Sequence, residues 1–218
     1  EPIYLSLEKL ISESKKDSFR KRIEQIKQRF PAGQEYVDYR LREEKVRFLW
    51  DFFREEPSGI PDGLNEFIEE NAYWIYDFAV YKVLKESHGG RAWDEWKDEY
   101  KNRDATALES FYKDNEEAIT FQMWVQWQLF RQFKEAKAYA ESKNVLLKGD
   151  LPILVSRDSA DVWAHTDFFK LEFASGAPPD MYCAKGQRWG MPTYKWDYIA
   201  ADGYKYLKEK LKYSQNFY

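Results

Sequence analysis

Several residue types are scarce in this 218-residue sequence, and each shortage excludes a kind of site. Cys183 is the only cysteine, so an intrachain disulfide cannot form, which fits the reducing conditions of a cytoplasmic location. His88 and His165 are the only histidines, and neither has Cys, Asp or Glu at the spacing of zinc ligands, so we expect no metal site. The sequence also has no Gly-rich phosphate loop and no serine nucleophile elbow.

Long apolar runs are absent as well. No run approaches the roughly 20 apolar residues that a membrane-spanning helix needs, so we expect no membrane partner. The start, Glu1 to Tyr4, lacks the basic and apolar regions of a signal peptide, and we expect none there. The net charge is −4 and no Lys/Arg tract stands apart from acidic neighbours, which argues against a nucleic-acid partner.

Aromatic residues, in contrast, are abundant. They make up 18% of the chain, with nine Trp, in an otherwise ordinary globular composition. Most of them are expected to fill the wide spaces between packed helices. The alternative is that some bind sugars, because the apolar faces of pyranose rings stack on flat aromatic rings. Composition alone favours packing and leaves sugar binding open.

Residues 1 to about 143 carry apolar residues at helical spacing. The predicted helices follow stripes from Phe19 to Phe30 (ended by Pro31), from Val37 to Phe53 (ended near Pro57), from Leu64 to Leu84 (ended by Gly89 and Gly90), and over about 116–143. A short turn is expected around Trp93 and Trp96. Asp104 is the expected N-cap of a further helix that begins at Ala105.

Residues 144–200 hold most of the loop-forming residues. Val145 to Leu147 is a short run of the buried-strand type that Gly149 and Asp150 close, with an extension from Leu151 to Val155 past Pro152 as the alternative. An irregular stretch then leads to a last helix from about Tyr198. This order amounts to one βα step, and a lone strand leaves its backbone groups unpaired. We therefore predict the α/β class, a slice of a larger α/β domain with a helical subdomain inserted into it.

Asp150 is the strongest candidate for a chemical role by position. It lies where the predicted strand ends, and in (β/α)₈ barrels that end of the strand faces the active site. A carboxylate there can accept hydrogen bonds from sugar hydroxyls and stabilise developing positive charge. A simple cap of the turn after Gly149 explains the residue equally well.

The loop after Asp150 holds further candidates. Asp180 and Tyr182 follow two prolines that restrict the backbone, although a rigid surface turn is the favoured interpretation. Gln187 and Trp189 lie between glycines, where a backbone can approach a ligand closely; the alternative is a Trp that packs the loop onto its domain. Asp158 or Ser159 is expected to cap a short helix, and Cys183 to be a packing residue.

Four segments in this order resemble the 4-α-glucanotransferase family: KGDLP (148–152), DSADVWA (158–164), GAPPD (176–180) and GQRWGMP (186–192). The helical part is similar too, in Val37-Asp38-Tyr39 with Lys45, Leu84-Lys85-Glu86 with Gly89-Gly90, and Trp93 with Trp96. Pro2 to Leu5 looks like the segment after the family's second barrel strand. The resemblance covers nearly the whole chain.

The resemblance implies a retaining transferase built on a (β/α)₈ TIM barrel, with residues 1–118 as an inserted helical subdomain and 119–218 as a barrel segment. Such an enzyme passes α-1,4-glucan segments between malto-oligosaccharides through a covalent glucosyl-enzyme, without a metal or an organic cofactor. The family's nucleophile lies in an Arg-Ile-Asp-His motif, which this sequence lacks, and the acid/base Glu comes later still. The chain alone is therefore expected to be inactive, with the remainder of the barrel as its partner.

The resemblance also assigns roles to individual residues. Asp150 matches a supporting acid at the end of the third strand, while Asp180 and Tyr182 match a mobile loop over the substrate groove and Trp189 a nearby Trp. With Gln187, these loop residues form the predicted substrate-binding set. Many members carry two adjacent aromatics after Pro-Pro-Asp, whereas this chain has only one there, which implies a narrower stacking platform. The alternative function is a glucan-binding module without catalysis.

Overall fold

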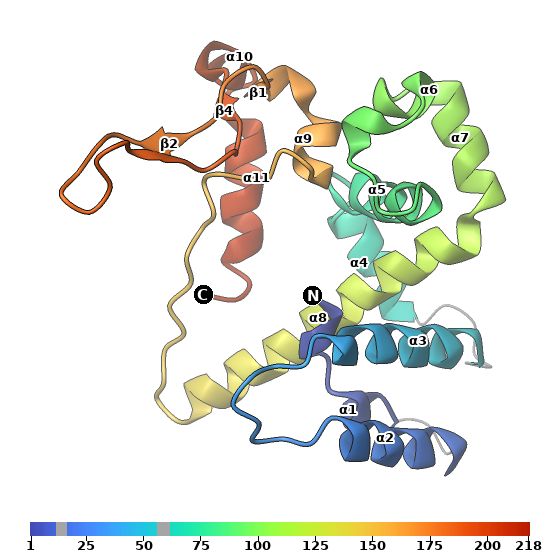
Figure 1. The fold of residues 1–218 in the computed structure, drawn as a ribbon. Helices are drawn as coiled ribbons and strands as arrows, with labels where there is room; N and C mark the ends of the chain where they lie inside the picture. Colours follow the sequence, from blue (N-terminus) through green and yellow to red (C-terminus); the bar gives the residue numbers. More distant parts are fainter. Residues whose placement is uncertain (12–16, 56–61) are drawn as a thin grey trace.

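The computed structural model describes residues 1–11, 17–55 and 62–218 (Figure 1). The helical region, residues 1–142, contains η1 (Pro2–Tyr4), α1 (Leu7–Ile11), α2 (Asp17–Arg29), α3 (Arg40–Glu55), α4 (Asp62–Glu70), α5 (Ile75–Ser87), η2 (Trp93–Glu95), α6 (Asp98–Lys101), α7 (Ala105–Asp114) and α8 (Glu116–Ser142). The loop region, residues 143–218, contains α9 (Ala160–Ala164), η3 (Thr166–Phe168), β1 (Phe169–Lys170), β2 (Gly176–Ala177), β3 (Gln187–Arg188), β4 (Thr193–Tyr194), α10 (Trp196–Ala201) and α11 (Lys205–Ser214).

Most predicted helices of the helical region are confirmed. α2 and α3 follow the first two apolar stripes, although Val37 lies outside α3 and is 62% exposed. The predicted end near Pro57 lies outside the described residues. α8 agrees with the long predicted helix, and Asp104 caps α7 by accepting a 2.9 Å hydrogen bond from the amide of Ala107. The cap satisfies one of the amides that a helix start leaves unpaired.

The third predicted helix is two helices, because the stripe from Leu64 to Leu84 is interrupted between α4 and α5. Asn71 is buried at the break, and its side chain amide donates to the carbonyl of Phe67 at 2.8 Å. Its side chain oxygen accepts from the indole N–H of Trp74 at 3.0 Å. Such local hydrogen bonds from a short polar side chain compete with the backbone hydrogen bonds of the helix. The chain therefore turns here, although the helical spacing of apolar residues continues.

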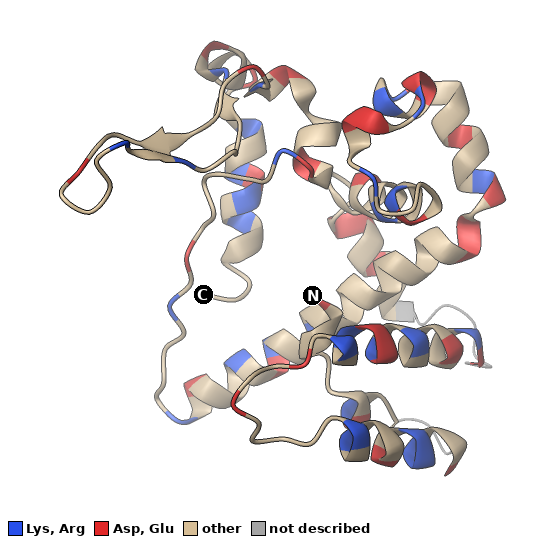
Figure 2. Cartoon of the chain, viewed as in Figure 1, with Lys and Arg blue, Asp and Glu red and all other residues tan. Residues whose placement is uncertain are grey.

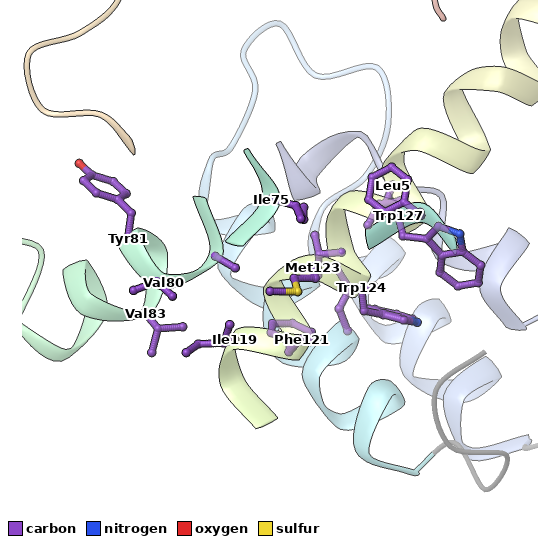
Figure 3. Packing of buried hydrophobic residues seen from close by; sticks show 14 of the residues in the cluster. Leu5, Ile75, Val80, Tyr81, Val83, Ile119, Phe121, Met123, Trp124 and Trp127 are labelled. Carbon is purple, nitrogen blue, oxygen red and sulfur yellow. The ribbon is translucent and has the colours of Figure 1, made fainter. Parts of the chain in front are cut away.

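The core is centred on α8, which packs against α3, α4, α5 and α7. Figure 3 shows apolar side chains of α5 and α8 in one cluster, among them Ile75, Ile119 and Met123, each at most 1% exposed. Each such side chain contributes about 1.5–3 kcal/mol by its burial. Lys, Arg, Asp and Glu lie interspersed along the helices (Figure 2). No helix of the described ranges combines the length and the apolar content that crossing a membrane requires.

The predicted strand over 145–155 is wrong: the structure has no strand there. Val145 is 52% exposed, Leu146 87% and Ile153 62%, so the segment runs as extended chain with these three side chains in contact with solvent, whereas Val155 at its end is buried in the core. A strand exists only when a neighbour pairs with its N–H and C=O groups, and no neighbouring strand of the described chain does so here. The apolar residues of this segment predicted a buried strand, but the rest of the described chain does not cover Val145, Leu146 or Ile153.

The irregular stretch after Val155 contains more order than predicted. β1 pairs antiparallel with β4, with Phe169 opposite Tyr194, and β2 pairs antiparallel with β3. The last predicted helix is again two, α10 and α11, separated where Tyr204 adopts φ 60°. Helices with short strands fit an α/β fragment. The division at residues 118 and 119 falls in the first turn of α8 and stays a prediction.

Candidate functional site

A β-hairpin projects from the loop region, and it carries most of the predicted site residues (Figure 1). Gly176 pairs with Arg188, and Ala177 pairs with Gln187. A Cβ atom on Gly176 would lie 2.1 Å from the carbonyl oxygen of Gln187, so only glycine allows the two backbones to approach this closely. Two further backbone bonds continue the pairing toward the root, from the amide of Trp189 to Ser175 (2.9 Å) and from Ser175 to Met191 (2.7 Å).

The tip of the hairpin is organised by Asp180. Its Oδ1 accepts hydrogen bonds from the amides of Tyr182 (2.8 Å) and Cys183 (2.7 Å), which closes the turn after the two prolines. The thiol of Cys183 donates to the carbonyl of Gly186 at 3.0 Å, which links the two ends of the turn, and its predicted packing role stays a prediction. Both bonds to Asp180 use the same oxygen, and the side chain remains exposed. The ring of Tyr182 is 90% exposed at the tip.

Trp189 and Gln187 lie together at the base of the hairpin. The indole N–H of Trp189 donates to the side chain oxygen of Gln187 at 2.9 Å, which orients the ring. Trp189 is 47% exposed in this chain. The hairpin presents exposed aromatic rings at Phe173, Tyr182 and Trp189, together with a carboxylate and an amide. Groups of these kinds can contact sugars, by stacking and by hydrogen bonds to hydroxyls.

Asp150 lies apart from these four residues, on the extended segment that links α8 to α9. Its side chain is exposed and forms no hydrogen bond or ion pair with any part of the chain that the structure describes. The backbone before it is tightly packed, because a Cβ atom on Gly149 would lie 2.2 Å from the ring of Tyr218. The structure thus brings together the hairpin residues but does not bring Asp150 into contact with them.

Asp158 has a role that the sequence did not predict. Ser159 alone caps α9, accepting from the amide of Val162 at 3.3 Å. The carboxylate of Asp158 instead binds the helical region: it accepts from the hydroxyl of Tyr81 at 2.6 Å and from the ammonium of Lys85. Partial burial by itself raises the pKa of Asp158, but these hydrogen bonds outweigh it and hold the pKa below its usual value.

The sequence did not specify this contact. Lys85 and Asp158 belong to two of the segments that resemble the family, one in each region of the chain. Their opposite charges are compatible with an ion pair, but only the fold shows that they meet.

The two histidines are not brought together. His165 is packed against the rings of Phe168 and Tyr206, with centroids 5.6 and 5.2 Å away, and burial lowers its pKa. His88 stacks on Trp96 with a centroid distance of 5.4 Å. Over residues 1–11, 17–55 and 62–218, no group of three or more His, Cys, Asp and Glu is placed to hold a metal ion.

Comparison with known proteins identifies the family. A sequence model of the 4-alpha-glucanotransferase family matches residues 1–218. The chain is 36% identical over 184 residues to the 4-alpha-glucanotransferase of Chlamydia pneumoniae, covering 82% of this chain and 34% of that protein. It is 37% identical over 197 residues to the enzyme of the same name from Thermus thermophilus, covering 84% and 38%.

The fold gives the same answer. The amylomaltase from Streptococcus agalactiae, solved in complex with acarbose, matches with a TM-score of 0.84 at 28% identity, over 99% of this chain and 45% of that one. The chain spans 34% to 45% of the length of these three relatives. With a match along all of its residues and the fold of a known member, the chain belongs to the 4-alpha-glucanotransferase family.

Proposed function

We propose that this chain is a segment of the catalytic domain of a 4-α-glucanotransferase, which transfers α-1,4-glucan segments between malto-oligosaccharides. The observation that carries the proposal is the exposed hairpin, with Tyr182 and Trp189 on a backbone held by Asp180 and two close glycine contacts. Exposed rings on a fixed backbone bind a sugar with little loss of conformational entropy. Membership of the family supplies the reaction.

The chemistry of a retaining transfer assigns different tasks to different parts of the domain. It needs a carboxylate nucleophile and a carboxylic acid about 5 Å apart, and a covalent glucosyl-enzyme between the two steps. The Arg-Ile-Asp-His motif that carries the family's nucleophile does not occur among these residues. We therefore assign the nucleophile and the acid/base to other parts of the protein. Asp150 is a supporting acid that accepts hydrogen bonds from sugar hydroxyls.

The same proposal gives the extended segment over 145–155 a partner. In a (β/α)₈ barrel, residues 145–149 would lie between two neighbouring strands that pair with their backbone and cover Leu146. The side chain of Leu146 is 87% exposed in this chain, which supports a neighbour supplied elsewhere in the protein. Pairing would also bring the carboxylate of Asp150 to the end of the barrel where the chemistry occurs.

The first experiment tests the reaction. The protein encoded by the full reading frame is incubated with maltotriose, in parallel with residues 1–218 alone, and the products are separated by chromatography. We expect glucose and longer malto-oligosaccharides from the full protein and no turnover from the chain alone. If the full protein is inactive and nevertheless binds maltoheptaose, the glucan-binding module without catalysis is the better description.

The second experiment tests the hairpin as a sugar-binding element. Tyr182→Ala removes an exposed ring, and the adjacent Met181→Ala removes a side chain that is 87% exposed and not aromatic, which makes it the matched control. We expect Tyr182→Ala to raise KM for malto-oligosaccharides roughly two- to twelvefold, the equivalent of about 0.5–1.5 kcal/mol of stacking. Binding of acarbose, which the Streptococcus agalactiae amylomaltase holds in its structure, gives the same comparison without turnover. Equal effects of the two variants would contradict a stacking role.

A further inference from the structure

The hairpin is attached to the rest of the described chain through few hydrogen bonds. Residues 171–192 continue from β1 and β4 at the root, and the backbone hydrogen bonds of this segment in the described chain lie within the hairpin itself or at that root. Among the described residues, one side chain from outside this segment hydrogen-bonds to it. That side chain is Arg157, whose Nη1 donates to the carbonyl of Leu171 at 2.6 Å.

The same guanidinium is held from the other side by the helical region. Its Nε and Nη2 each donate to Oδ2 of Asp94, in η2, at 3.3 Å. The indole N–H of Trp93, a buried residue, donates to the backbone carbonyl of Arg157 at 2.8 Å. Arg157 thus spans the distance between η2 and the hairpin root, with three of its N–H donors in use and its backbone fixed.

The residue after Arg157 strengthens the attachment. Asp158 accepts hydrogen bonds from Tyr81 and Lys85 of α5, and α5 packs along α8 in the core. The base from which the arginine side chain extends is therefore bound to the most buried part of the molecule. Arg157 and Asp94 are 42% and 33% exposed, so their ion pair alone contributes little. The ion pair acts mainly by fixing the orientation of the Arg157 side chain, because a planar guanidinium directs its N–H donors along fixed directions.

We propose that Arg157 is a positioning residue for the hairpin: it sets where Tyr182 and Trp189 stand relative to the helical region. The inference rests on the proposed function, in which the hairpin binds glucan. Without the tether, the root pivots on the short β1–β4 pair, and only a fraction of the population has its rings in the binding orientation. The apparent affinity for glucan falls to that fraction of its original value, whereas the groups that perform the chemistry are unchanged.

The test uses the full-length protein and two independent measurements. In Arg157→Ala, hydrogen exchange of the backbone amides of 171–175 and 189–193 should be faster, because the root opens more often. KM for malto-oligosaccharides should rise roughly three- to tenfold, the effect of reducing the competent orientation to about a third or a tenth of the population. The value of kcat should stay within about twofold, since the bound complex is the same.

Companion variants separate a tether from a general loss of stability. Arg157→Lys keeps the charge and one donor group, and it should give intermediate values of both measurements. Arg54→Ala removes another exposed ion pair, with Glu117 at 3.1 Å between α3 and α8, and it should change neither. Combining Asp94→Ala with Arg157→Ala should change hydrogen exchange at the root and KM little beyond the effect of Arg157→Ala alone, because both substitutions remove the same contact.

Three results would overturn the proposal: unchanged exchange at the root in Arg157→Ala, faster exchange with unchanged KM, or a loss of kcat as large as the rise in KM. If the wild-type protein performs no transfer from maltotriose, the proposed function fails instead. Hydrogen exchange then still decides whether Arg157 holds the hairpin, and acarbose binding decides whether the orientation matters for sugar.

Discussion

The helical region and the loop region reach stability in different ways. The helical region satisfies its backbone within each helix and buries most of the largest fully buried side chains, such as Phe48, Leu84 and Ile119. The loop region combines the helices α9, α10 and α11 with strand pairs that are two residues long, and it leaves Leu146 and Tyr182 in contact with solvent. A helix needs only its own residues for hydrogen bonds, whereas an extended chain depends on neighbours. The loop region should therefore depend more on single contacts with the rest of the protein.

The largest expected effect comes from Trp163, where the two regions meet. Its side chain is fully buried against the rings of Tyr81 and Trp96, and its indole N–H donates to the carbonyl of Tyr100 at 2.9 Å. Trp163→Ala should lower the free energy of unfolding by about 3–5 kcal/mol, because it leaves a large cavity and an unpaired carbonyl. Urea unfolding followed by circular dichroism measures the loss.

Trp189→Ala is the matched control for this prediction. The same side chain type is removed from the same region, but Trp189 is half exposed and hydrogen-bonds only within the hairpin. We expect a loss of less than about 1 kcal/mol, within the range of substitutions at exposed positions. A loss comparable to that of Trp163→Ala would show that the hairpin is part of the common core, and the contrast between the regions would fail.

Asp158 gives the next largest effect and a pH dependence. Asp158→Asn keeps the shape but removes the charge that Lys85 binds, and it should cost about 1–3 kcal/mol at neutral pH, the range of hydrogen bonds to charged groups reduced for partial exposure. Because the folded pKa of Asp158 is depressed, its contribution is present above the unfolded pKa of about 4 and is lost as the pH falls through the folded pKa. The free energies of unfolding of wild type and variant, measured from pH 6 down to acid pH, should converge. A difference that persists to the lowest pH would contradict the prediction.

Gly186 sharpens the comparison within the hairpin. It has φ +72°, and a Cβ atom there would lie 2.6 Å from the carbonyl oxygen of Ala177. Gly190 has φ +81° and open space around it. Both alanine variants should destabilise the hairpin by about 1–2 kcal/mol for the left-handed backbone, with a further loss at Gly186 from the clash. Hydrogen exchange of the hairpin amides should report this, while the global unfolding transition stays unchanged.

The smallest expected effect belongs to His165. Burial lowers its pKa, partly opposed by Asp77 and Asp161, so the unfolded chain binds a proton more readily than the folded one. Stability is therefore greatest above the unfolded pKa of about 6.5 and falls as the pH drops below it. His165→Gln should flatten this dependence between about pH 7 and 5 in urea unfolding. Equal slopes in wild type and His165→Gln would contradict the prediction.

Local sequence patterns were sufficient where the interactions are local. The spacing of apolar residues predicted α2 and α8, and Asp104 was correctly identified as a cap because its bond to Ala107 lies within one turn. The predicted substrate-binding residues fall on one hairpin, since the prolines and glycines that shape the turn lie beside them, and their binding role stays a prediction. The break between α4 and α5 was missed, because Asn71 overrides an apolar stripe that continues through it.

The sequence by itself determined the family, the helices of the core and the exposed segment that carries Tyr182 and Trp189, because each is encoded by neighbouring residues or by motifs. Only the tertiary structure decided that Asp158 binds Lys85, that Arg157 joins Asp94 to Leu171, and that 145–155 has no partner strand in the described chain. Contacts of this kind join residues far apart in the chain. An ion pair or a strand has no stability until the fold brings its partner within reach, and no local pattern specifies which partner that is.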